Sequence, residues 1–449
     1  MLETKHESLS SLLFGKKEEM KYSYTIPPQK GLLTKILRHP LCMPYNRLAL
    51  SLALVNIVCY KIFSPQFSTM NETQLLEALF VPIVLNFMVA TIIRSQYVIN
   101  LLFAMATSIP TSFPLSLRWA CGKVYHFGGI QVGTYFSGAM WLFYLFTQID
   151  LSPLSELIAV HIGVLTLVML VSLPKFRAKY HNNFEIIARF GNWTSLALFW
   201  VETILFIKTV NHEATLAHLL NSPFIWALVL ITFITILPWL KLKKVPVQVK
   251  TPSNHVALAS FNYGETPFAG SSTDLSFSPL LEWHSFANVP APNTSGFRLT
   301  ISRAGDWTGD FIKKRPQFIW RKGITTAGVG NVEKLFKKVI WVATGSGVGP
   351  CIPHLLTKKV PSRLVWSTRN PRKTYGDELV DEILAVQPNP IIWDTTSQGK
   401  PNLVELAYKA YREFEAEAII CIANKKVTWQ VVYEFESRGI PAFGAIWDS

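Results

Sequence analysis

Long apolar runs fill the first 240 residues of the chain, whereas the later segments alternate between apolar and polar positions over short distances. A helix that crosses a bilayer needs about 20 mostly apolar residues. Six stretches predict such helices, at 47–63, 76–93, 128–148, 157–173, 193–210 and 223–240. The apolar stretch from Tyr97 to Ile109 is too short to cross, so we expect it to be re-entrant or to lie in the interface. The pattern thus predicts an N-terminal segment over 1–46 and an α-helical membrane bundle of six spans over 47–240.

Lysine and arginine residues set the expected orientation of this bundle. They lie before the first span, between spans two and three, between spans four and five, and after span six, whereas the loops 64–75, 149–156 and 211–222 contain none. Positive segments are retained on the cytoplasmic side of a membrane. We therefore expect both termini to be cytoplasmic and everything after residue 240 to face the cytosol.

The second half of the chain predicts two further domains. Short alternating segments separated by Pro, Gly, Ser and Asn clusters indicate a small antiparallel β-barrel over 245–330. From residue 337 to 449, strands such as Val339–Ala343 and Arg363–Thr368 alternate with helices such as Asn402–Ala416. Alternating strands and helices predict a parallel, doubly wound α/β sheet.

Composition and charge exclude several classes of protein. Only 16% of the residues are charged, against roughly 25% in an average soluble domain, which disfavours a single cytosolic enzyme domain. The net charge of +14 is explained by the cations that set the topology, and no basic helix has base-reading spacing, so we expect no nucleic-acid partner. The five cysteines show neither CxxC spacing nor an even framework, so neither a disulfide scaffold nor a metal site is expected.

The histidines argue against haem in the bundle. Two b-type haems need paired histidines about 13 residues apart on each of two helices, and no predicted span contains such a pair. Only His161 lies well inside a span, and Glu202 is central in another. An ionisable side chain at membrane depth is a functional candidate, although a buried helix–helix contact explains these two residues as well.

A glycine-rich loop lies between the first predicted strand and helix of the α/β domain. It reads Thr344-Gly-Ser-Gly-Val-Gly-Pro350. Glycines let the backbone approach a diphosphate closely, and the following helix N-terminus supplies amides and partial positive charge. The loop therefore indicates a nucleotide site, with a tight turn that binds no ligand as the alternative.

Several motifs of the second half resemble the flavoprotein superfamily of ferredoxin–NADP reductases and NADPH oxidases. Leu281-Glu-Trp-His-Ser-Phe-Ala287 is similar to the flavin-binding stretch of these proteins, Ala304-Gly-Asp-Trp-Thr308 to their Gly-Asp-Trp-Thr element, and Thr344–Pro350 to their nicotinamide loop. The resemblance covers about residues 245–449. Six spans joined to such a module without haem histidines most resemble the fungal transmembrane oxidoreductase-like proteins TmpA and TmpL.

The resemblance implies a ferredoxin-reductase-like module in which the barrel holds FAD, the sheet holds NADPH, and a hydride crosses where they meet. The residues that it implies for FAD are Trp283, His284, Ser285, Phe286, Arg298 and Arg303. Those implied for the nicotinamide nucleotide are Thr344, Gly345, Ser346, Gly347 and Gly349, followed by Ser367, Thr368, Arg369, Arg372, Lys373 and Tyr375. Hydroxyls and cations after the second strand suit a 2′-phosphate, which favours NADPH while leaving NADH possible, and an ordinary solvated loop is the alternative.

The sequence also departs from the family pattern. Ala287 stands where Ser or Thr accompanies the reactive flavin nitrogen, and the second phosphate loop is replaced by Lys322–Gly330. Cys421 is placed to approach the hydride path and Trp447 to shield the flavin, although both also suit a core.

Three functions compete on these observations. The first is an integral membrane, flavin-dependent oxidoreductase that passes electrons from cytosolic NADPH to an unknown acceptor, such as a quinone, a small molecule or a partner protein, without haem. The second is a non-catalytic membrane regulator or nucleotide sensor with a degenerate reductase domain. The third is a transporter gated by the cytosolic domain. The resemblance suggests the plasma membrane or a secretory-pathway membrane, and the lipid bilayer and a nicotinamide nucleotide as partners.

Overall fold

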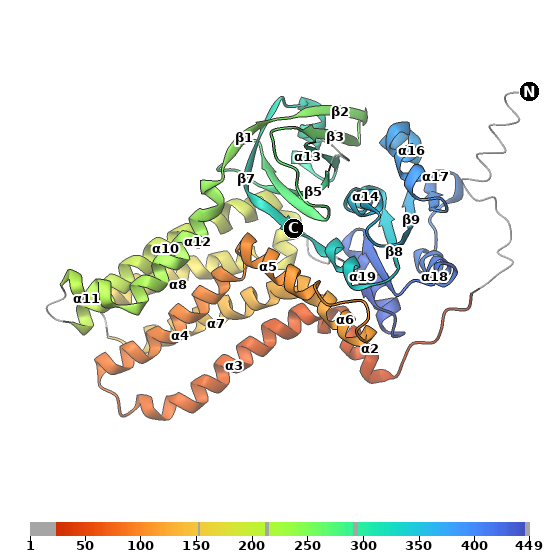
Figure 1. The fold of residues 1–449 in the computed structure, drawn as a ribbon. Helices are drawn as coiled ribbons and strands as arrows, with labels where there is room; N and C mark the ends of the chain where they lie inside the picture. The colour runs from red at the N-terminus through yellow and green to blue at the C-terminus, as the bar shows by residue number, and fades with distance from the viewer. Residues whose placement is uncertain (1–23, 151–152, 212–214, 291–294, 445–449) are drawn as a thin grey trace, which may run out of the picture.

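The molecule consists of a helical bundle, a curled antiparallel sheet and a parallel α/β sheet, which meet at one end of the bundle (Figure 1). A computed structural model describes residues 24–150, 153–211, 215–290 and 295–444. The helices of the bundle are α3 (Pro44–Phe67), α4 (Glu72–Ile92), α7 (Gly128–Gln148), α8 (Pro153–Val171), α10 (His181–Val210) and α12 (Pro223–Leu240). Each helix overlaps one of the six predicted spans, and α10 begins twelve residues before its span.

Five of these helices, α3, α4, α8, α10 and α12, are long and apolar enough to cross a membrane. Helix α7 has the length of a span but is less apolar, because its sequence contains glycines and several polar side chains. The turn between α3 and α4 lies at the end of the bundle remote from the sheets (Figure 1). This turn belongs to the predicted loops without Lys or Arg, so the cation-poor end of the bundle faces away from the two sheets.

The glycines of α7 bring that helix against α3. A Cβ atom on Gly129 would lie 2.1 Å from the Tyr45 carbonyl oxygen, and one on Gly133 would lie 2.6 Å from that of Ala49. Two small residues four apart allow such close helix packing inside a membrane. The glycines that make α7 less apolar are therefore the residues that allow it to pack closely between α3 and α4.

Shorter helices connect the bundle to the sheets. They are α2 (Leu32–Arg38), η1 (Pro40–Cys42), α5 (Gln96–Ala106), α6 (Leu115–Cys121), η2 (Gly122–Phe127), α9 (Pro174–Lys179) and α11 (Leu216–Asn221). Helix α5 is the stretch expected to be re-entrant or interfacial, and it does not cross the bundle. Its Asn100 amide donates to the Thr325 carbonyl and accepts from the Ala327 N–H, at 2.9 and 2.8 Å. Helix α5 thus covers an open strand edge that would otherwise leave backbone groups unpaired.

The curled antiparallel sheet has seven strands in the order β1-β7-β4-β5-β6-β3-β2. They are β1 (Lys243–Pro246), β2 (Gln248–Ser253), β3 (Val256–Phe261), β4 (Ser271–Ser276), β5 (His284–Pro290), β6 (Phe297–Ser302) and β7 (Phe318–Ala327). Helix α13 (Asp306–Lys314) packs Trp307 and Phe311 into the interior of this sheet, beside Leu299 and Ile301. The predicted antiparallel barrel is thus a curled sheet whose interior α13 helps to fill.

The second sheet is parallel, with the strand order β10-β9-β8-β11-β12. Its strands are β8 (Val339–Thr344), β9 (Ser362–Thr368), β10 (Ile391–Asp394), β11 (Ala418–Ile422) and β12 (Ala442–Phe443). The helical segments around it are η3 (Val329–Leu335), η4 (Gly345–Gly347), α14 (Val348–Thr357), α15 (Pro371–Tyr375), α16 (Asp377–Val386), α17 (Thr395–Gln398), α18 (Leu403–Phe414) and α19 (Lys425–Glu436). Apolar residues of α14 and α16 cover one face, and those of α18 and α19 the other. The prediction of a doubly wound α/β sheet is therefore confirmed.

Candidate functional site

The glycine-rich loop lies at the point where the strand order of the parallel sheet reverses. Strand β8 lies between β9 and β11, and the loop leaves the carboxyl end of β8 to enter α14. Gly345 has a φ of +50°, and a Cβ on Gly347 would lie 1.9 Å from the Ile422 carbonyl oxygen at the end of β11. Ligands of open α/β sheets bind in the crevice outside such a reversal point. The glycines thus bring the chain across this crevice as no larger residue would allow.

Hydroxyl groups from three elements surround the loop. Thr344 is half-buried at the end of β8, and Ser367 and Thr368 are buried at the end of β9. Burial raises the pKa of the Tyr375 hydroxyl, and the nearby hydroxyls of Thr368 and Ser302 partly oppose this effect. Because Ser302 belongs to β6, the curled sheet closes this side of the crevice. The site therefore offers neutral hydrogen-bonding groups to the sugar and phosphates of a nucleotide.

The three predicted cations next to this loop are in different environments. Arg369 and Lys373 are exposed, and the part of the chain that the structure describes contains no ion pair for either. Arg372 forms ion pairs with Asp377 and Asp381 at 2.8 and 2.7 Å, and its hydrogen bonds to these carboxylates raise its pKa. Arg369 and Lys373 are thus the cations that can meet a 2′-phosphate, whereas Arg372 already has two anionic partners.

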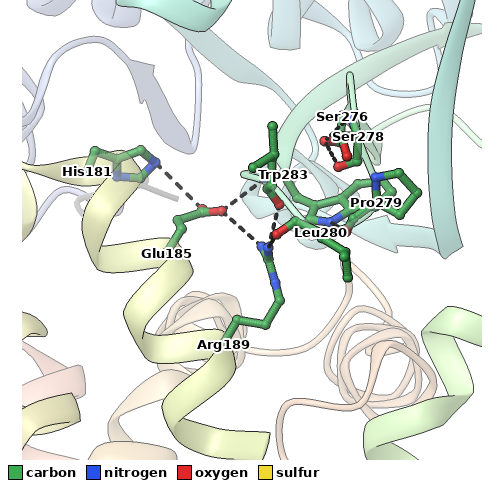
Figure 2. Close-up of polar contacts among 9 residues, drawn as sticks. His181, Glu185, Arg189, Ser276, Ser278, Pro279, Leu280 and Trp283 are labelled. Atoms are coloured by element: carbon green, nitrogen blue, oxygen red, sulfur yellow. Dashed lines mark hydrogen bonds and ion pairs between the residues drawn. The ribbon is translucent and has the colours of Figure 1, made fainter.

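The segment that leads into the predicted flavin stretch is held by the bundle (Figure 2). The Trp283 N–H donates to Glu185 Oε2 at 3.0 Å, and Arg189 donates to the Leu280 carbonyl at 2.9 Å and also to that of Leu281. Glu185 is paired with Arg189 at 3.5 Å and lies 3.6 Å from His181 Nε2. We call these three residues of α10 the clasp. It fixes the start of β5 to the end of a bundle helix.

The side chains of the predicted flavin stretch point in two directions. His284 and Phe286 pack against Trp307, with ring centroids 4.6 and 5.6 Å apart. Ser285 is exposed on the opposite face of β5, beside the half-buried Ala287. The predicted set is therefore divided between the interior and the outer face of the curled sheet.

The two arginines proposed for the flavin diphosphate contact protein groups. Arg298 is paired with Glu382 of α16, and Arg303 donates to the Asn254 carbonyl at 3.0 Å. Their role in binding a phosphate stays a prediction. To bind one, each arginine would have to release its present protein partner or share its guanidinium between that partner and the phosphate.

Lys322, in the segment that replaces the second phosphate loop, is enclosed by two tryptophans. Its Nζ lies 4.5 Å from the centre of the Trp283 ring and 5.3 Å from that of Trp239. Burial lowers the pKa of Lys322 to about 8, and the Asp274 carboxylate partly opposes this effect. An aromatic-lined cation thus sits where the family pattern has a glycine loop.

Of the two residues predicted nearest to the hydride path, the structure describes Cys421 but not Trp447. Cys421 is buried among residues of α18 and α19, and burial raises the pKa of its thiol to about 12. It is therefore a neutral thiol on the face of the sheet that these helices cover. Trp447 lies outside the described residues, so its shielding role stays a prediction.

The buried polar atoms test whether the cofactors fit. His284 Nε2 and Trp307 Nε1 are buried without a hydrogen-bond partner among the described residues, and such groups are costly to leave unpaired. A flavin offers ring nitrogens, carbonyls and phosphates as acceptors, so the chemistry of these two atoms fits such a group. Trp307, however, is 4% exposed and belongs to the interior of the curled sheet. The loop and hydroxyls at Gly345–Gly347 fit a nicotinamide nucleotide. No group of three or more His, Cys, Asp or Glu residues in the described ranges is placed to hold a metal ion.

Sequence reasoning missed the clasp and the contact of Ser302 with Tyr375. The four-residue spacing of His181, Glu185 and Arg189 places them on one face of a helix and could have indicated the clasp. The Ser302 contact joins two domains, and no local pattern in the sequence marks it.

Comparisons with known proteins find similarity to adenylate-forming reductases. A family model described as the C-terminal domain of adenylate-forming reductase 03009 matches residues 329–449. Adenylate-forming reductases 06235 and 03009 of Coprinopsis cinerea are 37% and 38% identical to the chain, over 435 and 441 residues. These alignments cover 94% of the chain but 42% of each relative, so the chain spans less than half the length of these curated relatives.

Solved structures show more distant similarity. A ferredoxin–NADP⁺ reductase from Neisseria gonorrhoeae with bound FAD and NADP is 15% identical, with a TM-score of 0.37, over 46% of this chain and 98% of that one. A flavohemoglobin from Malassezia yamatoensis with bound FAD and heme is 11% identical, with a TM-score of 0.40, over 81% of this chain and 98% of that one.

Proposed function

We propose that the chain is a membrane-anchored, NADPH-dependent flavin oxidoreductase. The observation that carries this proposal is the Gly345–Gly347 loop, which crosses the reversal point of a parallel sheet with Gly347 in contact range of β11. The names of the relatives from Coprinopsis cinerea, which are called reductases, support the same class of activity. The resemblance to TmpA and TmpL suggests the anchored form of this activity.

In this proposal, each part of the site has a separate role. The loop amides and the α14 N-terminus bind the diphosphate of NADPH, and Thr344, Ser367, Thr368 and Tyr375 orient its sugar and nicotinamide. Trp283, His284, Ser285 and Phe286 hold FAD, which when bound accepts a hydride and passes electrons on. Arg369 and Lys373 favour NADPH over NADH.

The helical bundle is the proposed membrane anchor. Five of its helices have the length and apolarity of spans, and α7 completes the packing between α3 and α4. Basic residues at the end of the bundle near the sheets support a cytosolic position for both sheets.

An absorbance spectrum of the purified full chain tests this proposal. We expect flavin bands that NADPH bleaches under anaerobic conditions. A colourless protein that still binds NADPH would contradict it and would support the nucleotide sensor.

The nucleotide sensor is favoured by Ala287, which lacks a hydroxyl, and by the contacts of Arg298 with Glu382 and of Arg303 with Asn254.

A further inference from the structure

Three polar side chains form a hydrogen-bonded chain inside the bundle. Both carboxylate oxygens of Glu202 on α10 lie 2.9 Å from His161 Nδ1 on α8. The other ring nitrogen, Nε2, lies 2.5 Å from Ser195 Oγ. His161 and Glu202 are 1% and 0% exposed, whereas Ser195 is half-buried. The chain thus runs from a sealed carboxylate to an accessible hydroxyl.

The distances assign the direction of the hydrogen bonds. A carboxylate accepts, so Nδ1 carries the proton in its bond to Glu202. In the imidazolium form, Nε2 also carries a proton and donates it to Ser195 Oγ, so the Ser195 hydroxyl can itself donate to a group in front of it. A histidine in this arrangement can take a proton at one nitrogen and release another at the second nitrogen. The three groups can therefore pass a proton to or from the position in front of Ser195.

Simple helix packing does not require these groups. Burying an ion pair in an apolar bundle is often no better than burying apolar residues of similar size. The ring of His161 is also flanked by Phe87 and Phe199, at centroid distances of 6.3 and 6.1 Å. Apolar side chains at the positions of His161 and Glu202 would pack well here, which favours a role in proton transfer.

The hydrogen-bonded chain continues a polar stripe that leads to the curled sheet. His181, Glu185, Arg189, Asn192, Ser195 and Glu202 recur on one side of α10. The first three form the clasp on Trp283, and Asn192 bonds to Tyr135 Oη of α7 at 3.3 Å. A single helix therefore connects the predicted flavin stretch to the buried carboxylate through polar positions.

We propose that the Ser195 position is the site of the electron acceptor, and that this acceptor is a lipid-soluble quinone. The inference rests on the proposed function, which supplies the electrons. The balanced reaction is NADPH + H⁺ + quinone → NADP⁺ + quinol. With His161 in its imidazolium form, the Ser195 hydroxyl donates a proton to the reduced quinone oxygen and recovers one from His161 Nε2, while Glu202 accepts from the Nδ1–H that His161 keeps.

The chemistry of the position matches this ligand. A quinone ring is flat and apolar, and its carbonyl oxygens accept hydrogen bonds. Ser195 and Tyr135 provide partly exposed hydroxyls and Asn192 provides an exposed amide, whereas Phe87 and Phe199 are buried around the His161 ring. Ligand sites are typically apolar with a few such polar groups.

The test compares two acceptors with the full chain in detergent or lipid nanodiscs. Decylubiquinone needs protons to complete its reduction, whereas ferricyanide takes electrons alone. The variants are Ser195→Ala and Glu202→Gln, with Thr194→Ala as the matched control, because Thr194 is exposed on the same helix. The ratio of the two rates in one preparation corrects for protein lost to misfolding.

We expect the quinone-to-ferricyanide ratio to fall about 100-fold in Ser195→Ala and Glu202→Gln and to stay at the wild-type value in Thr194→Ala. The wild-type quinone rate should also slow in D₂O. An unchanged ratio in both variants would overturn the inference. So would a wild-type chain that reduces ferricyanide but not the quinone, and in that case the proposed function would stand.

Binding gives a readout that is independent of turnover. Decylubiquinone should quench the tryptophan fluorescence of the chain, and Ser195→Ala should weaken the quenching about tenfold. If neither acceptor is reduced, the proposed function fails. Weaker quenching in Ser195→Ala would then still support the quinone site, and equal quenching would reject it.

Discussion

At the residue scale, the cations after β9 differ by their partners rather than by their position in sequence. Arg372 is closer than Arg369 to the centre of the predicted cluster, but its guanidinium is paired with Asp377 and Asp381. The sequence places six candidate residues here, from Ser367 to Tyr375, and only the structure separates the exposed cations from the paired one.

Removing the exposed cations should therefore change the preference between nucleotides. We expect Arg369→Ala combined with Lys373→Ala to weaken NADPH binding at least tenfold while leaving NADH binding nearly unchanged, because hydrogen bonds to charged groups contribute about 1.5–3 kcal/mol. Titration calorimetry with both nucleotides measures this. Arg372→Ala is the control and should leave the NADPH-to-NADH ratio unchanged, with a stability cost of about 1 kcal/mol or less. Equal losses for both nucleotides in the double variant would contradict a 2′-phosphate site.

Lys322 predicts a pH dependence of stability. Burial lowers its pKa to about 8 in the folded chain, below the value of about 10.4 expected when unfolded. The unfolded chain therefore binds more protons between these values, so this residue makes stability rise with pH from about 8 to 10.4. Below pH 8 the full cost of burying the charge is present.

Thermal unfolding of the wild type and of Lys322→Met across this pH range measures the effect. The advantage of the Met variant should shrink as pH rises, from an upper limit of about 3 kcal/mol at neutral pH. Contacts of Lys322 with the rings of Trp239 and Trp283 reduce this limit. A difference between the two proteins that does not change with pH would show that Lys322 is not destabilised by burial.

At the scale of elements, α10 and α7 each have a role that hydropathy does not predict: α10 contacts the segment before β5, and α7 packs closely against α3. The predicted span 193–210 gives only the apolar part of α10, which starts twelve residues earlier, at His181. Polar and charged side chains interrupt the apolar ones in those added residues, so a search for apolar runs ends before the clasp. In α7 the small residues that lower apolarity are the ones that contact α3.

Loss of the clasp should expose the Trp283 amide. We expect Glu185→Gln to raise its hydrogen-exchange rate about tenfold, because the charged acceptor of the Trp283 N–H is replaced by a neutral one. Hydrogen–deuterium exchange with mass spectrometry of peptides spanning Leu280–His284 measures this. Thr209→Ala, at the far end of the same helix, serves as the control. Equal protection in both variants would show that Glu185 does not hold β5.

A larger side chain at Gly133 should separate α7 from α3. The Cβ of Gly133→Leu would lie 2.6 Å from the Ala49 carbonyl oxygen, closer than any real contact. We expect a cost of about 1–3 kcal/mol, seen as a lower thermal midpoint in detergent. Gly163→Leu is the matched control on α8, because no atom lies within 4 Å of its Cβ position. Similar midpoints for both variants would argue against close packing at Gly133.

At the scale of the whole molecule, the order of parts was predictable and their junctions were not. The length of the apolar runs located the six bundle helices. Alternating apolar and polar residues located the curled sheet, and alternating strands and helices located the parallel sheet. Each of these signals lies within the segment that forms the element. The junctions depend on pairs far apart in sequence, such as Asn100 with Thr325 and Arg118 with Glu417. For the same reason, the glycine loop was found from sequence, whereas the partners of Arg298 and Arg303 were not.

The predicted orientation can be tested by labelling in sealed membranes. With the native cysteines replaced, we expect a cysteine at Thr73 and one at Lys250 to react with a membrane-impermeant maleimide from opposite sides. Thr73 lies next to the turn remote from the sheets, and Lys250 lies on β2. Labelling of both positions from the same side would reject the proposed topology.

The thirty residues of α10 have a mechanical consequence. A helix embedded in lipid adjusts its tilt to the thickness of the hydrocarbon layer. In the proposed membrane anchor α10 would do so, and its clasp holds Leu280, Leu281 and Trp283, which directly precede β5. A thinner or thicker bilayer would therefore pull on the aromatic stack of His284 and Trp307 through a lever of one continuous helix. On this proposal, the composition of the surrounding lipid would act on the curled sheet through α10.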